Sequence, residues 1–250
     1  MPGRRTHAVR GIVLARTALS EKDYIVTALA DTGVQLRMVA KGARRPGGKL
    51  AGRVELFCET EFFVAEGRNF GTITEAKAVN AHMGLRDYER AAAAAAVCEI
   101  ARLTCFEDAE DPYLHPILSR TLTALEEAAD RAHIDLSLAA YAMKVLAHGG
   151  WYPELDACVA CSDEHPSYFV PAAGGVLCES CAHEIEGALP LTSSQLAWMH
   201  ALLRSTFDEL GSAAIDAECA LFLAGIAHSW ASTHLDARLK AYEFYMSLGD

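Results

Sequence analysis

Two short strands joined by a tight turn are predicted by residues 24–40, YIVTALADTGVQLRMVA. Both halves are rich in β-branched and apolar residues, and Asp31-Thr32-Gly33 between them is a tight-turn signal. Similar runs lie on either side of this pair, at residues 9–17, 54–64 and 70–76. Five short strands in about 70 residues, without a helix long enough for a parallel crossover, predict a small antiparallel barrel, for which the five-stranded OB-fold is the common architecture.

A basic loop separates the third and fourth predicted strands. Residues 41–49 contain three Gly and one Pro, so neither helix nor strand is favoured there. The loop holds four cations and no acid, namely Lys41, Arg44, Arg45 and Lys49. In a chain whose net charge is −11, this density indicates contact with phosphate rather than plain solubility.

Charge is unevenly distributed along the chain. Residues 1–53 hold eleven Lys and Arg against three Asp and Glu, whereas residues 81–250 hold nine against 25. A ligand responds to the face that it approaches within a Debye length, ~8 Å, so the acidic average does not exclude nucleic acid. The basic set begins with Arg4 and Arg5. The predicted DNA-binding residues are Arg10, Arg16, Arg37, Lys41, Arg44, Arg45, Lys49 and Arg53.

The aromatic residues of the same segment have two possible roles. OB barrels bind single strands in a cationic groove where aromatic rings stack on bases, but such rings also fill barrel cores. Alternation along the strands does not decide between these roles. The residues concerned are Tyr24, Phe57, Phe62, Phe63 and Phe70.

From residue 81 onward the pattern predicts a helical domain. A run of six alanines, Ala91 to Ala96, permits close helix contacts within a predicted helix at 88–106. Asp111 followed by Pro112 is a helix-start signal. Further helices are predicted at 135–148, from Thr192 or Ser193 through Phe207, and twice within 213–248.

The strongest local motif is a pair of C-x2-C sequences between residues 151 and 190. Cys158 and Cys161 form the first, Cys178 and Cys181 the second, and residues 168–177 between them are typical of a hairpin. This spacing predicts one structural Zn²⁺ ion in a closed four-sulfur shell that leaves no position for catalytic water. The alternatives are four buried free thiols or a thioredoxin-like redox pair, although neither C-x2-C follows a βαβ pattern.

The histidines near the cysteine pairs and the other four cysteines are not expected to bind the metal. His165 and His183 lie near the cysteine pairs and are expected at the surface, because four cysteines already complete a zinc shell. The four remaining cysteines lie in apolar contexts and are expected to pack in the core. These are Cys58, Cys98, Cys105 and Cys219.

No enzymatic motif survives inspection. The loop from Gly42 to Leu50 resembles a Walker A sequence, but Lys49 is one residue too far along and Leu50 replaces the Mg-binding Ser or Thr. Metalloprotease, hydrolase and zinc deaminase signatures are missing from the sequence. We expect a non-enzymatic, soluble cytoplasmic protein, since the chain has neither a long apolar span nor the apolar region of a secretory signal.

Several segments resemble the RecO family of DNA repair proteins. In the amino-terminal part these are GIVLAR at 11–16, SEKDYIVT at 20–27 and AKGARR at 40–45. The two cysteine pairs lie in similar segments, GWYPELDACVAC at 150–161 and GGVLCESC at 174–181. The stretches 140–146 and 234–245 are similar to helical parts of the family.

The resemblance implies a mediator of homologous recombination. Such a protein binds and anneals single-stranded DNA, partners RecR, and acts on strands coated by single-stranded DNA-binding protein so that RecA can load. The strongly acidic helical part and Gly47-Gly48, where the family often has a Ser, depart from the pattern. The rival hypothesis is an OB-fold and zinc protein that binds RNA or another protein in transcription or translation; a zinc enzyme with an open coordination position is a third.

The predicted architecture is therefore α+β with more than one domain. Residues 1–80 form a five-stranded OB-fold β-barrel that binds nucleic acid, and residues 81–250 form an α-helical domain. A zinc-ribbon-like insertion with four cysteine ligands interrupts the helical domain at about 151–190.

Overall fold

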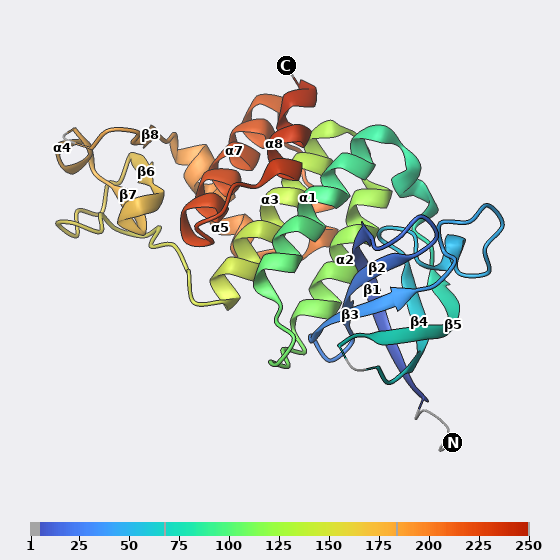
Figure 1. Ribbon diagram of the computed structural model, residues 1–250. Coiled ribbons are helices and arrows are strands. Elements are labelled where there is room, and N and C mark those ends of the chain that lie inside the picture. Colours follow the sequence, from blue (N-terminus) through green and yellow to red (C-terminus); the bar gives the residue numbers. More distant parts are fainter. Residues whose placement is uncertain (1–5, 68, 184, 250) are drawn as a thin grey trace. The chain divides into compact units, whose positions relative to one another are not determined.

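The computed structural model describes residues 6–67, 69–183 and 185–249. Arg4 and Arg5 of the predicted basic set lie outside these residues. The chain divides into two compact units, Met1–Glu126 and Glu127–Asp250. Each unit is described by itself below (Figure 1).

The first unit contains a closed barrel of five strands with the order β1-β2-β3-β5-β4. The strands are β1 (Thr6–Ala18), β2 (Tyr24–Ala30), β3 (Gln35–Ala40), β4 (Glu59–Ala65) and β5 (Gly71–Asn80). Pairing of β1 with β4 closes the barrel. This five-stranded order confirms the OB-fold prediction.

Two details of the predicted barrel were wrong. The pairing of β3 with β5 is parallel, at Met38–Gly71 and Val39–Thr72, so the barrel is not antiparallel throughout. This pairing is non-local, and the pattern of either strand alone does not reveal it. The fourth strand begins at Glu59 rather than at residue 54, because Ala51–Arg53 form a 3-10 turn and Val54 is already buried.

The core of the barrel comes from both strands and loop. Val13, Val26 and Phe62 are fully buried strand residues. Three residues of the connection between β3 and β4, Ala43, Leu50 and Val54, pack into the same cluster. The basic loop is thus part of the connection that covers the barrel core.

Two helices complete the first unit, α1 (Tyr88–Thr104) and α2 (Leu114–Glu127). The Asp87 side chain caps α1 by accepting a hydrogen bond from the N–H of Arg90, and the alanine run lies mostly buried. The side-chain amide of Gln35, at the start of β3, donates to the carbonyls of Arg102 and Cys105 at the end of α1. The most compact division of the chain therefore groups α1 and α2 with the barrel, whereas the predicted boundary near residue 80 follows the change from strand to helix.

The second unit is built on the contact of two long helices, α3 (Arg131–His148) and α7 (Ala217–His234). The shorter helices are α5 (Ser193–Arg204), α6 (Phe207–Ser212) and α8 (Lys240–Met246). The helix predicted to run from Thr192 through Phe207 is two helices. Thr206 caps α6 through a capping box with Glu209, and this second start signal ends α5 early.

The predicted hairpin between the cysteine pairs is confirmed. Strand β6 (Tyr168–Val170) pairs antiparallel with β7 (Gly175–Leu177), and β8 (Leu189–Pro190) pairs with the other edge of β6. The short helix α4 (Glu179–Ala182) carries the last cysteine. The ring of Phe169 in β6 contacts that of Trp230 in α7, with centroids 5.5 Å apart. Among the described residues, no helix combines the length and the apolar composition needed to cross a membrane.

Candidate nucleic-acid interface and metal centre

The basic loop at 41–49 has neither helix nor strand, as predicted, and is fastened at its base. The N–H of Gly42 donates to Asp23 Oδ1 at 2.7 Å, and the N–H of Arg44 donates to the carbonyl of Lys22 at 3.1 Å. The bond from Gly42 holds the pKa of Asp23 below its usual range. The loop therefore has a fixed attachment to the turn between β1 and β2.

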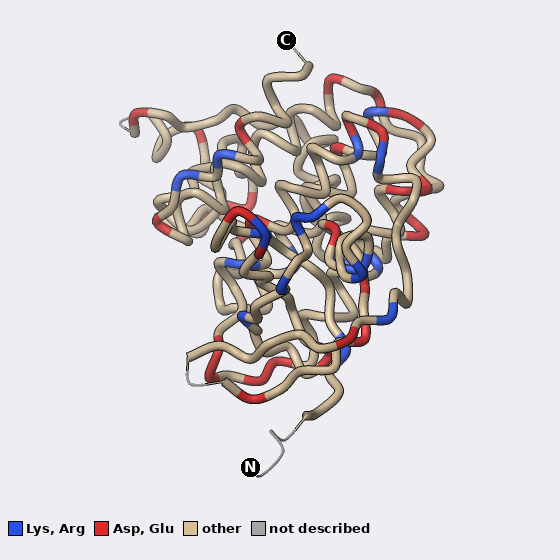
Figure 2. Tube along the Cα trace, turned by 45° about the vertical axis from the view of Figure 1, so that its right-hand side comes forward, with Lys and Arg blue, Asp and Glu red and all other residues tan. Residues whose placement is uncertain are grey.

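The cations of this loop remain at the surface. Lys41, Arg44, Arg45 and Lys49 are all exposed, and so is Arg53 just beyond the loop. The guanidinium of Arg53 donates to the backbone carbonyl of Lys49 at 2.9 Å. Lys22 is a further exposed cation beside the loop that the predicted set omitted. Figure 2 marks the Lys and Arg positions along the trace in blue, and the acidic positions in red.

Tyr24 links the loop to the barrel. The guanidinium of Arg44 lies 5.5 Å from the centre of the Tyr24 ring, and that of Arg16 lies 5.2 Å from it. Arg44 also donates to the carbonyl of Ser20, while Arg16 pairs with Glu55 at 2.9 Å. Tyr24 is half-buried against the barrel core, so its ring positions two predicted DNA-binding arginines.

A second arginine and aromatic pair joins β3 to the residue that precedes β5. The guanidinium of Arg37 is 4.9 Å from the centre of the Phe70 ring and 3.8 Å from the carboxylate of Glu107. Arg37 pairs across the sheet with Thr27, three positions along β2 from Tyr24. At a rise of roughly 3.3 Å per residue, Tyr24 and Thr27 are about 10 Å apart along β2, and their side chains point to opposite faces of the sheet.

The structure places the aromatic residues of the barrel in different surroundings. Phe62 is fully buried in the barrel core, whereas Tyr24 and Phe70 contact arginines. Phe63 is half-buried in β4, and Phe57 is half-buried in the connection before it. Tyr24 and Phe70 are accordingly the rings best placed beside positive charge.

Arg10 is set apart from the loop by its own partners. Its Nε donates to Glu59 Oε1 at 2.8 Å, and Glu59 is only 4% exposed. His115 Nε2 lies 3.3 Å from the same carboxylate oxygen, and burial lowers the pKa of His115. The charge of Arg10 therefore compensates a buried carboxylate, a role that its position in β1 did not reveal.

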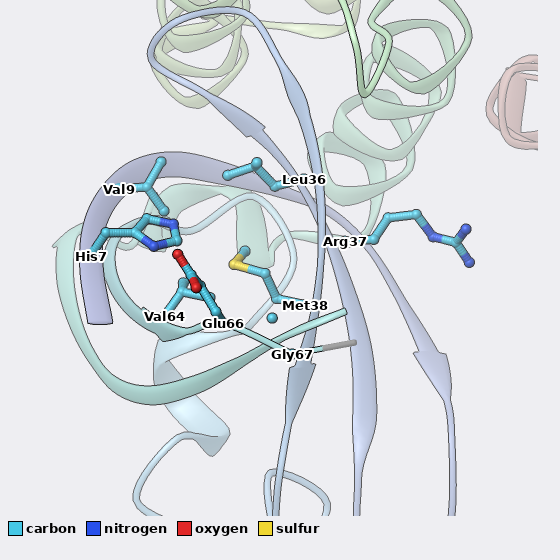
Figure 3. A pocket seen from close by; sticks show the side chains of 9 residues that line it. His7, Val9, Leu36, Arg37, Met38, Val64, Glu66 and Gly67 are labelled. Atoms are coloured by element: carbon cyan, nitrogen blue, oxygen red, sulfur yellow. The ribbon is translucent and has the colours of Figure 1, made fainter. Parts of the chain in front are cut away.

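A pocket of about 250 Å³ opens at one end of the barrel (Figure 3). Figure 3 shows His7 and Glu66 at this pocket together with apolar side chains, while Arg37 points away from it. The apolar residues are Val9, Leu36, Met38 and Val64. Arg37 therefore presents its charge to the outer face of the barrel rather than to this pocket.

The second unit brings the four predicted zinc ligands together. The sulfur atoms of Cys158, Cys161, Cys178 and Cys181 all lie within 4.8 Å of one another. Sulfur atoms about 2.3 Å from a tetrahedral zinc ion are roughly 3.8 Å apart. The Sγ atoms of Cys161 and Cys178 are 3.7 Å apart, which fits this geometry.

The ionisation of these thiols also fits a bound cation. Burial opposes ionisation of Cys158, but backbone hydrogen bonds with Cys178, Ala160 and Cys161 outweigh it and lower its pKa to about 6. Hydrogen bonds with the neighbouring thiols Cys161 and Cys178 raise the pKa of Cys181 to about 12. One thiolate therefore disfavours the next, and a cation among them would allow all four to ionise.

The two histidines near the cysteine pairs and the four other cysteines lie where the sequence predicted. His165 and His183 are exposed and take no part in the four-sulfur group. Cys58, Cys98, Cys105 and Cys219 are buried and separate from it. Burial raises the pKa of Cys98 to about 12, as expected for a thiol that packs in a core.

Two family models together match nearly the whole chain. Residues 5–82 match the model described as Recombination protein O N terminal, and residues 85–243 match Recombination protein O C terminal. The chain belongs to the RecO family. The resemblance noted in the sequence is thereby confirmed, and with it membership of a family of DNA repair proteins.

Individual RecO proteins are similar over most of their length. The chain is 30% identical to "DNA repair protein RecO" of Desulforudis audaxviator, over 98% of both chains. Identity to the protein of the same name from Roseiflexus sp. is 37%, over 75% of this chain and 66% of the relative. The RecO of Bifidobacterium longum subsp. infantis is 33% identical, over 82% of this chain and 86% of the relative.

Proposed function

We propose that this RecO protein is a non-enzymatic recombination mediator that binds and anneals single-stranded DNA. With RecR, it helps to load RecA on strands coated by single-stranded DNA-binding protein. The observation that carries the proposal is the basic loop at 41–49, fastened to an OB barrel in a member of a DNA repair family.

Binding would rest mainly on phosphate neutralisation by the loop. Lys41, Arg45 and Lys49 are exposed, and Arg44 is oriented by Tyr24 and by the carbonyl of Ser20. Each phosphate contact releases counterions, so the affinity for single strands falls with salt by a logarithmic slope of about 0.7 per contact. A loop attached at fixed points holds these cations near one another without further ordering on binding.

Bases would stack at the arginine and aromatic pairs. Tyr24 begins β2 and lies beside Arg16 and Arg44, and Phe70 lies just before β5 beside Arg37 of β3. Stacking of a base on an aromatic ring contributes roughly 1–3 kcal/mol and tolerates any sequence. Stacking of this kind suits a mediator, which must act on strands of arbitrary sequence.

Annealing follows from the same charge. Two single strands repel each other through their phosphates, and a cationic surface that holds one strand lowers the cost of bringing a second one near. This role requires position rather than covalent chemistry. It is consistent with the absence of an enzymatic motif from the sequence.

The four cysteines would hold one structural Zn²⁺ ion. When bound, the ion supplies a fixed link between the two cysteine pairs, and its closed sulfur shell offers no position for a reacting water. The chain's own contribution is the β6–β7 hairpin, which spaces the pairs, and the backbone hydrogen bonds that favour the Cys158 thiolate. The metal thereby stabilises the 151–190 insertion.

The DNA-binding part of the proposal is tested by fluorescence-anisotropy titration of a labelled single strand at several salt concentrations. We compare the wild type with Lys41→Ala/Arg44→Ala/Arg45→Ala. A matched control, Lys77→Ala/Arg204→Ala/Lys240→Ala, removes three exposed cations elsewhere. We expect weaker binding and a shallower salt slope in the loop variant than in the control.

Two results would contradict this assignment. Binding by the wild type that does not depend on salt, or a loop variant that matches its control, would mean that the loop is ordinary surface. RNA that outcompetes single-stranded DNA would favour an RNA-binding role instead.

The mediator step is tested separately with RecA. We measure ATP hydrolysis by RecA on a strand coated with single-stranded DNA-binding protein, with RecR and with or without this RecO protein. The proposal predicts a shorter lag when the protein is present, and a smaller gain with the loop variant. An unchanged lag with wild-type protein would refute the loading role while leaving DNA binding intact.

A further inference from the structure

A second pocket, of about 560 Å³, lies in the first unit between residues 52–58 and residues 81–86. Its size is within the range of roughly 300–1,000 Å³ that is typical of small-ligand sites. The lining is Arg16, Gly52, Glu55, Leu56, Phe57, Cys58, Ala81, His82, Leu85 and Arg86. Of these residues only Arg16 belongs to the predicted DNA-binding set, and none belongs to the metal centre.

The charged residues of the pocket favour an anion. Arg16 and Arg86 contribute two positive charges, against one negative charge from Glu55. Arg16 pairs with Glu55 at 2.9 Å. Arg86 is exposed, and no ion pair joins it to another described residue. One cation of the lining is therefore left to bind a group such as a phosphate.

His82 supplies a polar group without a partner at the wall of this pocket. Its side chain is completely buried, and its Nδ1 lies 3.0 Å from Glu126 Oε2. Glu126 is itself held by the N–H of Gly84, which donates to Oε1 at 2.6 Å. The other ring nitrogen, Nε2, has no hydrogen-bond partner among the described residues. Buried polar groups normally have partners, so this nitrogen beside the pocket is an exception.

The pocket also has strained backbone and apolar surface. Among the described residues, four non-glycine residues have a positive φ, and two of them, Phe57 at 70° and His82 at 41°, line this pocket. Such backbone strain persists only where surrounding contacts enforce it, and it clusters at functional sites. Leu56, Phe57 and Leu85 offer apolar contact area of the kind that receives the face of a base.

Arg16 connects this pocket to the basic loop. It lines the pocket and also contacts the ring of Tyr24, which Arg44 of the loop contacts as well. A strand whose phosphates follow the loop therefore arrives beside the pocket at Arg16. No separate path is needed for DNA to reach it.

We propose that this pocket binds one unstacked nucleotide of the single strand held by the basic loop. Arg86 contacts its phosphate, and the apolar residues Leu56, Phe57 and Leu85 contact its base. This inference rests on the proposed binding of single-stranded DNA and adds to it a site that takes one nucleotide out of the stack.

The test is photo-crosslinking of the full-length protein to a thymidine oligonucleotide that contains 4-thiothymidine, followed by peptide mapping. Gly52→Trp fills the pocket, and a side-chain carbon at Gly52 meets no atom within 4 Å, so the substitution does not force the fold apart. Gly211→Trp is the matched control, because Gly211 is equally open and lies in α6. Crosslinks to peptides at 52–58 and 81–86 are expected in the wild type and the control, and are expected to disappear in Gly52→Trp while those to 41–49 persist.

The possible failures are distinct. Wild-type crosslinks to the loop and barrel that spare 52–58 and 81–86 would overturn the pocket and leave the proposed function standing. Pocket crosslinks that survive in Gly52→Trp would also overturn it, because the base would then lie outside the filled space. A wild type that shows no salt-dependent binding of the strand would remove the proposed function itself.

A second variant measures the charge in the pocket. Arg86→Ala and Lys77→Ala each remove one exposed cation from the first unit, but only Arg86 lines the pocket. We expect Arg86→Ala to weaken binding of the thymidine strand about fivefold more than Lys77→Ala, the equivalent of one lost charged contact. Equal loss in the two variants would show that Arg86 acts only through long-range charge, and would overturn its contact with phosphate.

Discussion

The basic loop at 41–49 and the cysteine insertion at 151–190 are both irregular connections, but different interactions hold them in place. The loop is fastened by hydrogen bonds to Asp23 and Lys22 and by residues of the same connection that pack into the barrel core. The insertion has a small core of its own, in which two of the four cysteines are buried. A metal ion among the sulfur atoms would add a link between the two cysteine pairs.

This difference bears on the part that each region could play in the proposed function. The bonds that fasten the loop come from the backbone N–H groups of Gly42 and Arg44, so they do not use the charged ends of its side chains. An insertion held by a metal ion can keep a defined shape with little core, but loses that shape when its ligands change. The first region would thus tolerate loss of its charges, whereas the second would not tolerate loss of a single sulfur.

The largest expected effect is therefore at the cysteines. Cys178→Ser removes one sulfur from the four, and apparent zinc-binding energies of ~10–16 kcal/mol in small zinc modules are coupled to folding. We expect loss of bound zinc and rapid amide exchange in β6 and β7, with little change in the barrel. Zinc content and hydrogen exchange measure both results.

Cys219→Ala provides the control for this change. Cys219 is buried in α7 and does not belong to the sulfur cluster, so the variant should keep its zinc. Full zinc content in Cys178→Ser, or protection of β6 and β7 after chelation, would show that the insertion holds its shape without the metal.

The next largest effect should come from a buried residue of the connection between β3 and β4, which contains the basic loop. Leu50 is only 8% exposed and packs with the barrel core. Leu50→Ala should destabilise the first unit by about 2–3 kcal/mol, near the lower end for buried leucines because the site lies at the edge of the core. Urea unfolding monitored in the barrel measures this loss. Leu19→Ala, at a position 51% exposed, should change stability by less than about 0.5 kcal/mol.

A loss below about 0.5 kcal/mol in Leu50→Ala would contradict the comparison, because the loop connection would then contribute no more to the barrel than exposed surface does. The same variant should leave zinc content unchanged. Opposite responses to the cysteine and leucine changes would confirm that the two regions are stabilised independently.

Local signals explain what the sequence revealed about these two regions. Glycine and proline within 41–49 were sufficient to predict an irregular loop, and two C-x2-C pairs were sufficient to predict the cluster that the structure brings together. Alternation and turn residues placed the five strands. Each of these signals lies within about 25 residues of sequence, where chain geometry limits the outcomes.

Long-range contacts explain what the sequence did not reveal. Glu59, 49 residues from Arg10, pairs with that arginine, and His115 approaches the same carboxylate. The parallel pairing of β3 with β5 and the early burial of Val54 likewise depend on contacts between distant segments. The pocket that contains His82 is formed by two segments that carry no motif at all.

A smaller effect is expected from the ring that links loop and barrel. Tyr24→Leu keeps an apolar side chain but removes the aromatic surface that Arg16 and Arg44 contact. Each exposed cation–π contact is worth about 0.5–1 kcal/mol, so DNA affinity should fall several-fold while the salt slope stays almost unchanged. Anisotropy titrations give both quantities. A change in slope as large as that of the triple loop variant would mean that the ring controls the whole loop rather than two arginines.

The smallest effect should be a pH dependence at the base of the loop. The hydrogen bond from the N–H of Gly42 holds the pKa of Asp23 below its usual value of about 3.9. A carboxylate with a lowered folded pKa contributes stability that is present above its unfolded pKa and is lost as the pH falls through the folded pKa. Asp23→Asn keeps an acceptor oxygen for Gly42 but cannot titrate. The wild type should therefore lose more stability than Asp23→Asn between pH 5 and pH 3 in urea unfolding, with all other carboxylates common to both. Equal losses would show that the charge of Asp23 does not hold the loop, and that its oxygen alone is enough.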